Sequence, residues 1–265
     1  MPTIENDEIS LHYERTGAAG ADVLMFSNSL GSNLHMWDKV LSAFESRYQI
    51  LRYDMRGHGK SSVPAGQYTI DQLGGDILSL LDHLGVERVN FCGLSIGGML
   101  AIWLGIRAPQ RVKRLILANT SARIGSRELW DQRISTAQTA GMTSLALMTL
   151  DRWFTPSYKD EHPDEMAMIR DMVAATHARG YEGCCRLLRD TDLRGEVSTI
   201  TAPALIISAT HDPATPPSDG RAIRAALPGS HYVELNASHL SAWERAEEFA
   251  AAAVEFLSEG RSNHG

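Results

Sequence analysis

Residues 86–107 read VERVNFCGLSIGGMLAIWLGIR and decide the fold. The apolar run at 89–92 is typical of a buried strand, and the apolar spacing at 99–106 is typical of a helix. Between them lies Gly-Leu-Ser-Ile-Gly, which matches the G-x-S-x-G pattern of a serine in a tight strand-to-helix turn. Such a turn brings backbone segments close together, so its flanking positions favour glycine. We therefore predict that Ser95 is a nucleophile.

Strand-like and helical patterns alternate along most of the chain. Buried strands are predicted at 23–26, 48–53, 115–118, 204–208 and 232–235, after an opening hairpin that turns at Asn6-Asp7. Helical spacing is found at 37–44, 70–84, 219–227 and in a closing helix that carries Trp243 to Phe256. This alternation predicts an α/β fold with a mostly parallel sheet and helices on both faces.

The alternation stops between residues 121 and 198, where helical spacing continues without strand-like runs. Aromatic and arginine side chains gather in this segment. We expect a helical cap (lid) at 121–198, inserted into a core formed by residues 1–120 and 199–265, and we expect it to roof a pocket.

Composition limits the possible partners. The chain has 265 residues, 43% of them hydrophobic, and a net charge of −7, which argues against a nucleic-acid or anionic-membrane partner. Three cysteines, two of them adjacent, form neither a disulfide framework nor a zinc-binding pattern. We see neither a signal peptide nor an apolar run long enough to cross a bilayer, so we expect a cytoplasmic protein. The oligomeric state is left open.

A nucleophilic serine needs a base, and the base needs an orienting acid. His239 follows the last predicted strand, and Asp212 follows the strand at 204–208, so both belong at the sheet edge that carries Ser95. The order Ser, Asp, His is that of the α/β-hydrolase arrangement. Asn119 occupies a rival acid position but carries no charge, and His58, between two glycines, is expected to shape a turn.

A tetrahedral intermediate needs two hydrogen-bond donors for its oxyanion. The first is the backbone N–H of Ile96, the residue after the nucleophile. The second is expected from the loop Asn28-Ser29-Leu30-Gly31, with the N–H of Leu30 favoured and Ser29 as the neighbouring alternative.

With these residues placed, the sequence resembles the α/β-hydrolase superfamily and, more closely, the 3-oxoadipate (β-ketoadipate) enol-lactone hydrolases. The resemblance covers nearly the whole chain. The matching stretches are 27–31, 36–38, 53–59, 91–98, 129–133, 152–156, 180–185 and 212–217. The resemblance implies the triad Ser95, Asp212 and His239, no metal or organic cofactor, and a role in aromatic-compound degradation.

The implied substrate is a small ring ester with a free carboxylate, which favours an arginine partner. Trp130 and Arg133 are three residues apart on a predicted cap helix and share one face. We expect Arg133 to pair with the carboxylate and Trp130 to wall the pocket, with Arg152 and Trp153 as the reserve pair. Ordinary packing and surface roles for these residues stay open.

Other activities fit the same triad. A broad carboxylesterase, a cofactor-free perhydrolase and a carbon–carbon bond hydrolase are rivals among enzymes. A small-molecule receptor that keeps a triad is the rival from another class.

Overall fold

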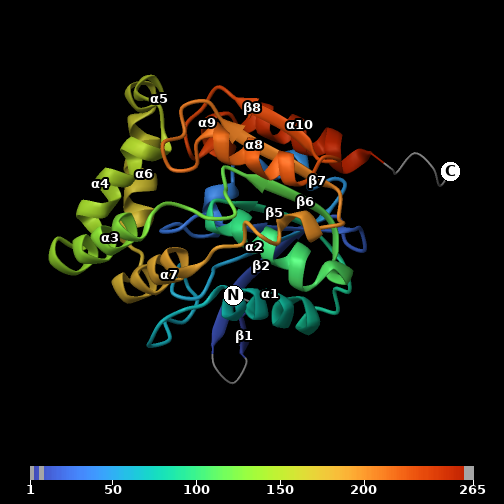
Figure 1. Ribbon diagram of the computed structural model, residues 1–265, viewed down its shortest axis with the longest axis horizontal. Helices are drawn as coiled ribbons and strands as arrows, with labels where there is room; N and C mark the ends of the chain where they lie inside the picture. Colours follow the sequence, from blue (N-terminus) through green and yellow to red (C-terminus); the bar gives the residue numbers. More distant parts are fainter. Residues whose placement is uncertain (1–2, 6–8, 260–265) are drawn as a thin grey trace.

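The computed structural model describes residues 3–5 and 9–259. Eight strands form one sheet in the order β1-β2-β4-β3-β5-β6-β7-β8 (Figure 1). They are β1 (Thr3–Glu5), β2 (Ser10–Gly17), β3 (Val23–Ser27), β4 (Gln49–Tyr53), β5 (Val89–Leu94), β6 (Val112–Ala118), β7 (Ala204–Ala209) and β8 (His231–Leu235). The pairs β1–β2 and β2–β4 are antiparallel and the other five pairs are parallel, which confirms the predicted sheet. The turn predicted at Asn6-Asp7 lies outside the described residues.

Helices cover both faces of this sheet. They are α1 (Ile70–His83), α2 (Ile96–Arg107), α8 (Pro217–Ala226), α9 (Ser241–Glu244) and α10 (Ala246–Ser258), with the 3-10 helices η1 (Leu34–Trp37), η2 (Leu41–Ala43), η3 (Pro109–Arg111) and η4 (Val197–Thr199). On one face α1 packs on α2, and both α2 and α8 contact η4. On the other face α10 contacts η2, and the ring centroids of Phe249 and Trp37 are 6.1 Å apart. The strands β3, β5 and β7 are consequently buried along their whole length.

The helix predicted at 70–84 is confirmed, together with its ends. Thr69 and Gln72 form a reciprocal capping box at the N-terminus of α1. At the other end Gly85 follows with a φ of 64°, a left-handed conformation that glycine adopts without a steric penalty.

The single helix predicted at 37–44 is wrong, because two 3-10 helices at Leu34–Trp37 and Leu41–Ala43, separated by a turn, take its place. An α-helix would pair the carbonyl of Leu34 with the amide of Asp38. That carbonyl instead accepts from the Arg52 guanidinium at 3.2 Å, and the Asp38 amide bonds to the carbonyl of His35. A cation from β4 therefore tightens this segment.

The closing helix is also interrupted, because α9 and α10 are separated at Arg245, whose φ and ψ are −128° and 52°. The side chains of the two residues at this break, Glu244 and Arg245, make hydrogen bonds outside the helices. Arg245 Nε donates to the carbonyl of Asn236, and the Glu244 carboxylate accepts from the amide of Ser238 at 2.9 Å. Both contacts hold the loop between β8 and α9.

Five helices lie between β6 and β7 along the chain, at the left of the sheet in Figure 1. They are α3 (Arg127–Thr139), α4 (Gly141–Trp153), α5 (Pro156–Glu161), α6 (Pro163–Ala174) and α7 (Ala178–Asp190). Helix α3 packs on α7 and α4, and α4 packs on α6. We call residues 121–198 the cap; its division from the core stays a prediction. None of the helices in the described part of the chain combines the length and apolar character of a membrane span.

The turn between β5 and α2 depends on glycines that touch backbone. A Cβ on Gly97 would lie 2.2 Å from the carbonyl oxygen of Ser27, at the end of β3. A Cβ on Gly93 would lie 2.0 Å from the carbonyl oxygen of Gly97. Because backbone cannot swing aside as a flexible side chain can, neither position accommodates a larger residue without a shift of the chain.

We predict that Gly97→Ala lowers the free energy of unfolding by about 3 kcal/mol or more, because the new methyl group collides with the β3 backbone. The control is Gly75→Ala on α1, where a Cβ meets nothing within 4 Å. Alanine is the better helix former there and is expected to stabilise by about 0.5–1 kcal/mol. Urea unfolding of both variants checks this, and equal stabilities for the two would contradict the packing account.

Candidate active site

Ser95 lies in the turn between β5 and α2 with a φ of 60° and a ψ of −117°. A non-glycine residue with a positive φ is strained and needs support from its surroundings. The Ser95 amide donates to the carbonyl of Ala118 at 3.0 Å, and its carbonyl accepts from Thr120 Oγ1 at 2.7 Å. The neighbouring strand β6 and its loop therefore hold the serine in this conformation.

Asp212 and His239 form a buried pair at the same edge of the sheet. Asp212 follows β7 and His239 follows β8, and His239 Nδ1 lies 2.8 Å from Asp212 Oδ2. The carboxylate also accepts from the amides of Ala214 and Thr215, from Thr215 Oγ1 and from Asn119 Nδ2, at 2.7 to 3.0 Å. Asp212 thus has donors on both oxygens, as a buried carboxylate requires.

The electrostatics of Asp212 follow from these contacts. Burial alone would raise the pKa of this carboxyl group, but the charge and hydrogen bond of His239 and the hydrogen bonds of Thr215 outweigh it. The pKa of Asp212 is therefore lower than usual, and the group is ionised at neutral pH. An ionised acceptor at Nδ1 fixes the imidazole with its proton on Nδ1, which leaves Nε2 free to accept one.

Sequence reasoning missed the role of Asn119. This residue follows β6 with a φ of 42°, and its amide group joins two partners. Nδ2 donates to Asp212 Oδ2 at 3.0 Å, and Oδ1 accepts from Ser241 Oγ at 2.5 Å. Its position after the strand next to β7 places it at the sheet edge that carries Ser95, as its place in the sequence predicts, but the pattern does not indicate a hydrogen bond to the acid.

Among the described residues, no acceptor is found for Ile96 N–H, at the start of α2, or for Leu30 N–H, in the loop after β3. The amides of Gly97 and Gly98 share this property with Ile96, because the first N–H groups of a helix have no partner within the helix. The carbonyl of Ser29, in the same peptide group as Leu30 N–H, accepts from Ser32 Oγ at 2.7 Å and from Ser32 N–H at 3.2 Å. Ser29 itself is buried and its amide contacts Met36 Sδ. Unused, oriented amides are what an oxyanion hole needs.

Of the substrate-binding residues predicted in the cap, Trp130, Arg133 and Trp153 are buried, and Arg152 of the reserve pair is partly exposed. On α3, Trp130 Nε1 donates to the carbonyl of Ile124 at 2.6 Å. Trp153 ends α4, and its carbonyl accepts from the amide of Leu240, the residue after His239. The cap is therefore bonded directly to the loop that carries His239.

Arg133 is 7% exposed and has only uncharged partners. Nε donates to Tyr181 Oη at 2.7 Å and Nη2 to Thr149 Oγ1 at 3.3 Å. Within residues 3–5 and 9–259, no carboxylate lies within ion-pair distance of this guanidinium. A buried cation without a counter-charge is costly, so this site favours an anionic ligand.

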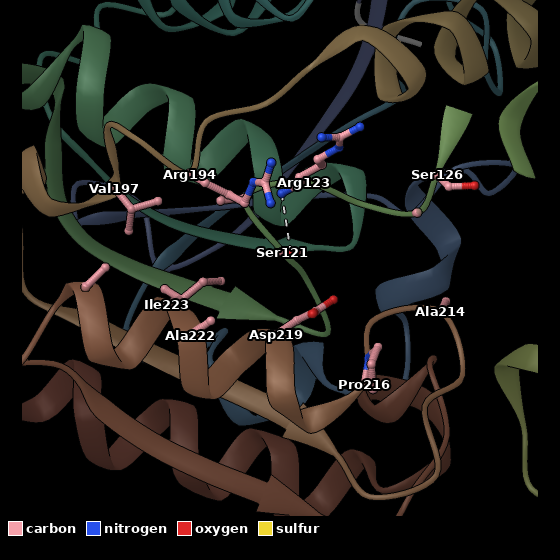
Figure 2. A pocket seen from close by; sticks show the side chains of 13 residues that line it. Ser121, Arg123, Ser126, Arg194, Val197, Ala214, Pro216, Asp219, Ala222 and Ile223 are labelled. Carbon is pink, nitrogen blue, oxygen red and sulfur yellow. Dashed lines mark hydrogen bonds between the residues drawn. The ribbon is translucent and has the colours of Figure 1, made fainter. Parts of the chain in front are cut away.

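A cavity of about 670 Å³ opens elsewhere, where both connections between the core and the cap pass α8 (Figure 2). Figure 2 shows Arg123 and Arg194 on one wall, and Asp219 and Ile223 on the other. None of the site residues predicted above lines this cavity. It borders the acid's loop through Pro216 and through Ala214, whose amide donates to Asp212, but neither Ser95 nor His239 lines it. In the described part of the chain, no cluster of three or more His, Cys, Asp or Glu side chains is arranged to hold a metal ion.

Comparisons with known proteins agree with this geometry. The α/β-hydrolase-fold family matches residues 22–146, and a TAP-like protein family matches residues 172–265. The chain is 38% identical to 3-oxoadipate enol-lactonase 2 of Acinetobacter baylyi, over 93% of this chain and 92% of that protein. It is 35% identical to enol-lactonase 1 of the same species, over 91% and 90%.

A solved structure gives the same result in three dimensions. The crystal structure of the enol-lactonase from Burkholderia xenovorans superposes with a TM-score of 0.96 at 45% identity, and the match covers 97% of this chain and all of that one. The chain is therefore a hydrolase of the α/β-hydrolase family and belongs with the 3-oxoadipate enol-lactonases.

Proposed function

We propose that the protein opens the ester ring of 3-oxoadipate enol-lactone to give 3-oxoadipate, with Ser95, His239 and Asp212 as its catalytic triad. The observation that carries the proposal is the Asp212–His239 pair, 2.8 Å apart and buried, at the sheet edge where the strained Ser95 turn ends β5. The enol-lactonase relatives support the choice of substrate. We further propose a cytoplasmic location and a place in aromatic-compound catabolism.

The first half-reaction forms an acyl-enzyme. His239 Nε2 takes the proton of Ser95 Oγ while Oγ attacks the lactone carbonyl carbon. The resulting oxyanion accepts from the amides of Leu30 and Ile96, which have no other acceptor among the described residues. The intermediate collapses, the ring C–O bond breaks, and the leaving enolate takes the proton from His239 Nε2 to give an enol, which tautomerises to the ketone; His239 is then neutral again.

The second half-reaction releases the product. His239 removes a proton from water, the hydroxide attacks the acyl carbon, and the same two amides stabilise the second oxyanion. Ser95 Oγ leaves and regains its proton from His239. Asp212 stays ionised throughout, and its negative charge stabilises the imidazolium that forms in each half-reaction. These steps require no metal or organic cofactor.

We propose that Arg133 binds the free carboxylate of the lactone. The guanidinium is buried and its partners Tyr181 and Thr149 are neutral, so a substrate carboxylate would supply the missing charge. Tyr181 also lies against the loop after β3, since a Cβ on Gly31 would come within 3.4 Å of its ring. One tyrosine thus separates the proposed anion site from the proposed oxyanion hole. Trp130, Trp153 and Ser29 are proposed to wall the remaining pocket.

The wild-type protein is expected to hydrolyse the enol-lactone far faster than a short-chain ester, and Ser95→Ala is expected to lose both activities. A spectrophotometric assay of ring opening measures the first rate. Ester turnover without lactone turnover would refute the substrate and keep the triad. Absence of both activities in the wild-type protein would favour a receptor.

Asp212→Asn is expected to lower kcat about 10³- to 10⁴-fold, because a neutral amide neither fixes the imidazole tautomer nor stabilises the imidazolium. Asp82→Asn is the matched control. Asp82 is exposed on α1, where it pairs with Arg111 at 2.7 Å, and its loss is expected to change kcat less than about threefold. Equal effects of the two substitutions would argue against Asp212 as the triad acid.

Arg133→Gln is expected to raise KM for the anionic lactone about 10- to 100-fold, which corresponds to the loss of one charged hydrogen-bonded pair. The KM for a neutral ester should change little. Arg186→Gln serves as the control. Unlike Arg133, Arg186 already has a carboxylate partner, because it lies 3.7 Å from Glu182 on α7. An unchanged KM for the lactone in Arg133→Gln would refute the anion site.

A further inference from the structure

Gly31 is held from two sides by residues that the catalytic scheme above does not use. Its N–H donates to His58 Nε2 at 3.0 Å, and its carbonyl accepts from Thr176 Oγ1 at 3.0 Å. His58 comes from the loop after β4, and Thr176 comes from the turn between α6 and α7 in the cap. Both side chains are at least 95% buried. We call this arrangement the Gly31 clamp.

The hydrogen bonds of His58 determine its tautomer. The carbonyl of Arg56 lies 3.2 Å from Nδ1 and can only accept, so the proton is on Nδ1. The amide of Gly31 can only donate, so Nε2 must be unprotonated. Burial lowers the pKa of His58, which agrees with a neutral ring at neutral pH.

One arm of the clamp acts on a peptide group next to Leu30, because the Gly31 N–H held by His58 belongs to the Leu30–Gly31 peptide. The Leu30 N–H itself belongs to the Ser29–Leu30 peptide, whose carbonyl is held by Ser32, and Thr176 holds the carbonyl of the following Gly31–Ser32 peptide. Because each peptide is planar, these three hydrogen bonds leave the chain around Leu30 little freedom to turn the Leu30 N–H. Gly31 itself has a φ of 84°, so the chain turns sharply at this point.

We propose that His58 and Thr176 are positioning residues that aim the Leu30 N–H at the oxyanion, one from the core and one from the cap. The proposal rests on the proposed function only in taking Leu30 as an oxyanion donor. Since the oxyanion exists only in the transition state and intermediates, loss of the clamp should lower kcat and leave substrate binding nearly unchanged. The cap then has two roles: it lines the pocket, and through Thr176 it helps to position an oxyanion donor.

Two substitutions of His58 separate its two hydrogen bonds. The amide of His58→Asn can replace Nδ1 as donor to the Arg56 carbonyl but is too short to reach Gly31. The oxygen of His58→Gln reaches the position of Nε2 and keeps an acceptor for Gly31. We expect kcat to fall about 10- to 100-fold in His58→Asn, less than for complete removal of an oxyanion donor, and only a few-fold in His58→Gln. KM should change less than about threefold in both.

Thr176 tests the same clamp from the cap. Thr176→Val keeps the shape and removes the hydroxyl, and Thr176→Ser keeps the hydroxyl. We expect a kcat loss of about tenfold in the valine variant and recovery of most of it in the serine variant. Melting temperatures of all four variants establish that they are folded.

A boronic acid provides a readout that a purely structural role would not change. A short alkylboronic acid forms a tetrahedral adduct with Ser95 Oγ and places an oxygen in the oxyanion hole. Its affinity should weaken in His58→Asn and Thr176→Val by about the same factor as kcat. Lactone affinity, measured in a Ser95→Ala background, should stay constant.

The results distinguish the clamp from the proposed function. Equal kcat losses in His58→Asn and His58→Gln, or unchanged boronate affinity in His58→Asn and Thr176→Val, would overturn the clamp. Failure of the wild-type protein to turn over the lactone would overturn the substrate instead. The boronate measurement would still test the clamp in that case, because it needs only Ser95 and the two amides.

Discussion

The start of α2 and the end of β3 meet backbone against backbone, and the rest of the site depends on that contact. A Cβ on Gly97 would lie 2.2 Å from the carbonyl oxygen of Ser27 and 2.9 Å from that of Asn28. The contact brings the amide of Ile96, next to Gly97, beside the loop that carries Leu30. Both proposed oxyanion donors therefore converge because a glycine allows two backbones to touch. The strained φ of Ser95 belongs to the same turn.

The cap is bonded to two loops of the candidate site, the loop after β3 and the loop after β8. Thr176 holds the loop after β3 through Gly31, and the carbonyls of Arg152 and Trp153 accept from Ser238 Oγ and Leu240 N–H on either side of His239. These contacts make the cap part of the site's framework, in addition to supplying Arg133. Movement of the whole cap away from the core would break the hydrogen bonds that hold the oxyanion loop and the base.

Local patterns were sufficient to predict the parts of the site that follow strands. Ser95 comes directly after β5, Asp212 and His239 lie in the loops after β7 and β8, and parallel strands place their carboxyl ends at one edge. The N-cap at Thr69 was equally local. The division of the chain into core and cap, and the roles of the site residues, remain predictions.

The features that sequence analysis missed depend on contacts between residues far apart in the chain. The carbonyl of Leu34 accepts from Arg52 instead of the Asp38 amide, and no periodicity records such a contact. Thr176 meets Gly31 across 145 positions, and Asn119 meets Asp212 across 93. Hydrogen bonds of this kind depend on the assembled fold, so composition and spacing do not reveal them.

The most direct test of the account is a crystal structure of Ser95→Ala with the intact enol-lactone bound. We predict that the lactone carbonyl oxygen points toward the Leu30 and Ile96 amides, at a distance that shortens to a full hydrogen bond only when the oxyanion forms, with the free carboxylate against the Arg133 guanidinium. A lactone whose carbonyl faces away from those amides, or whose carboxylate lies in solvent while Arg133 keeps only Tyr181 and Thr149, would contradict the account.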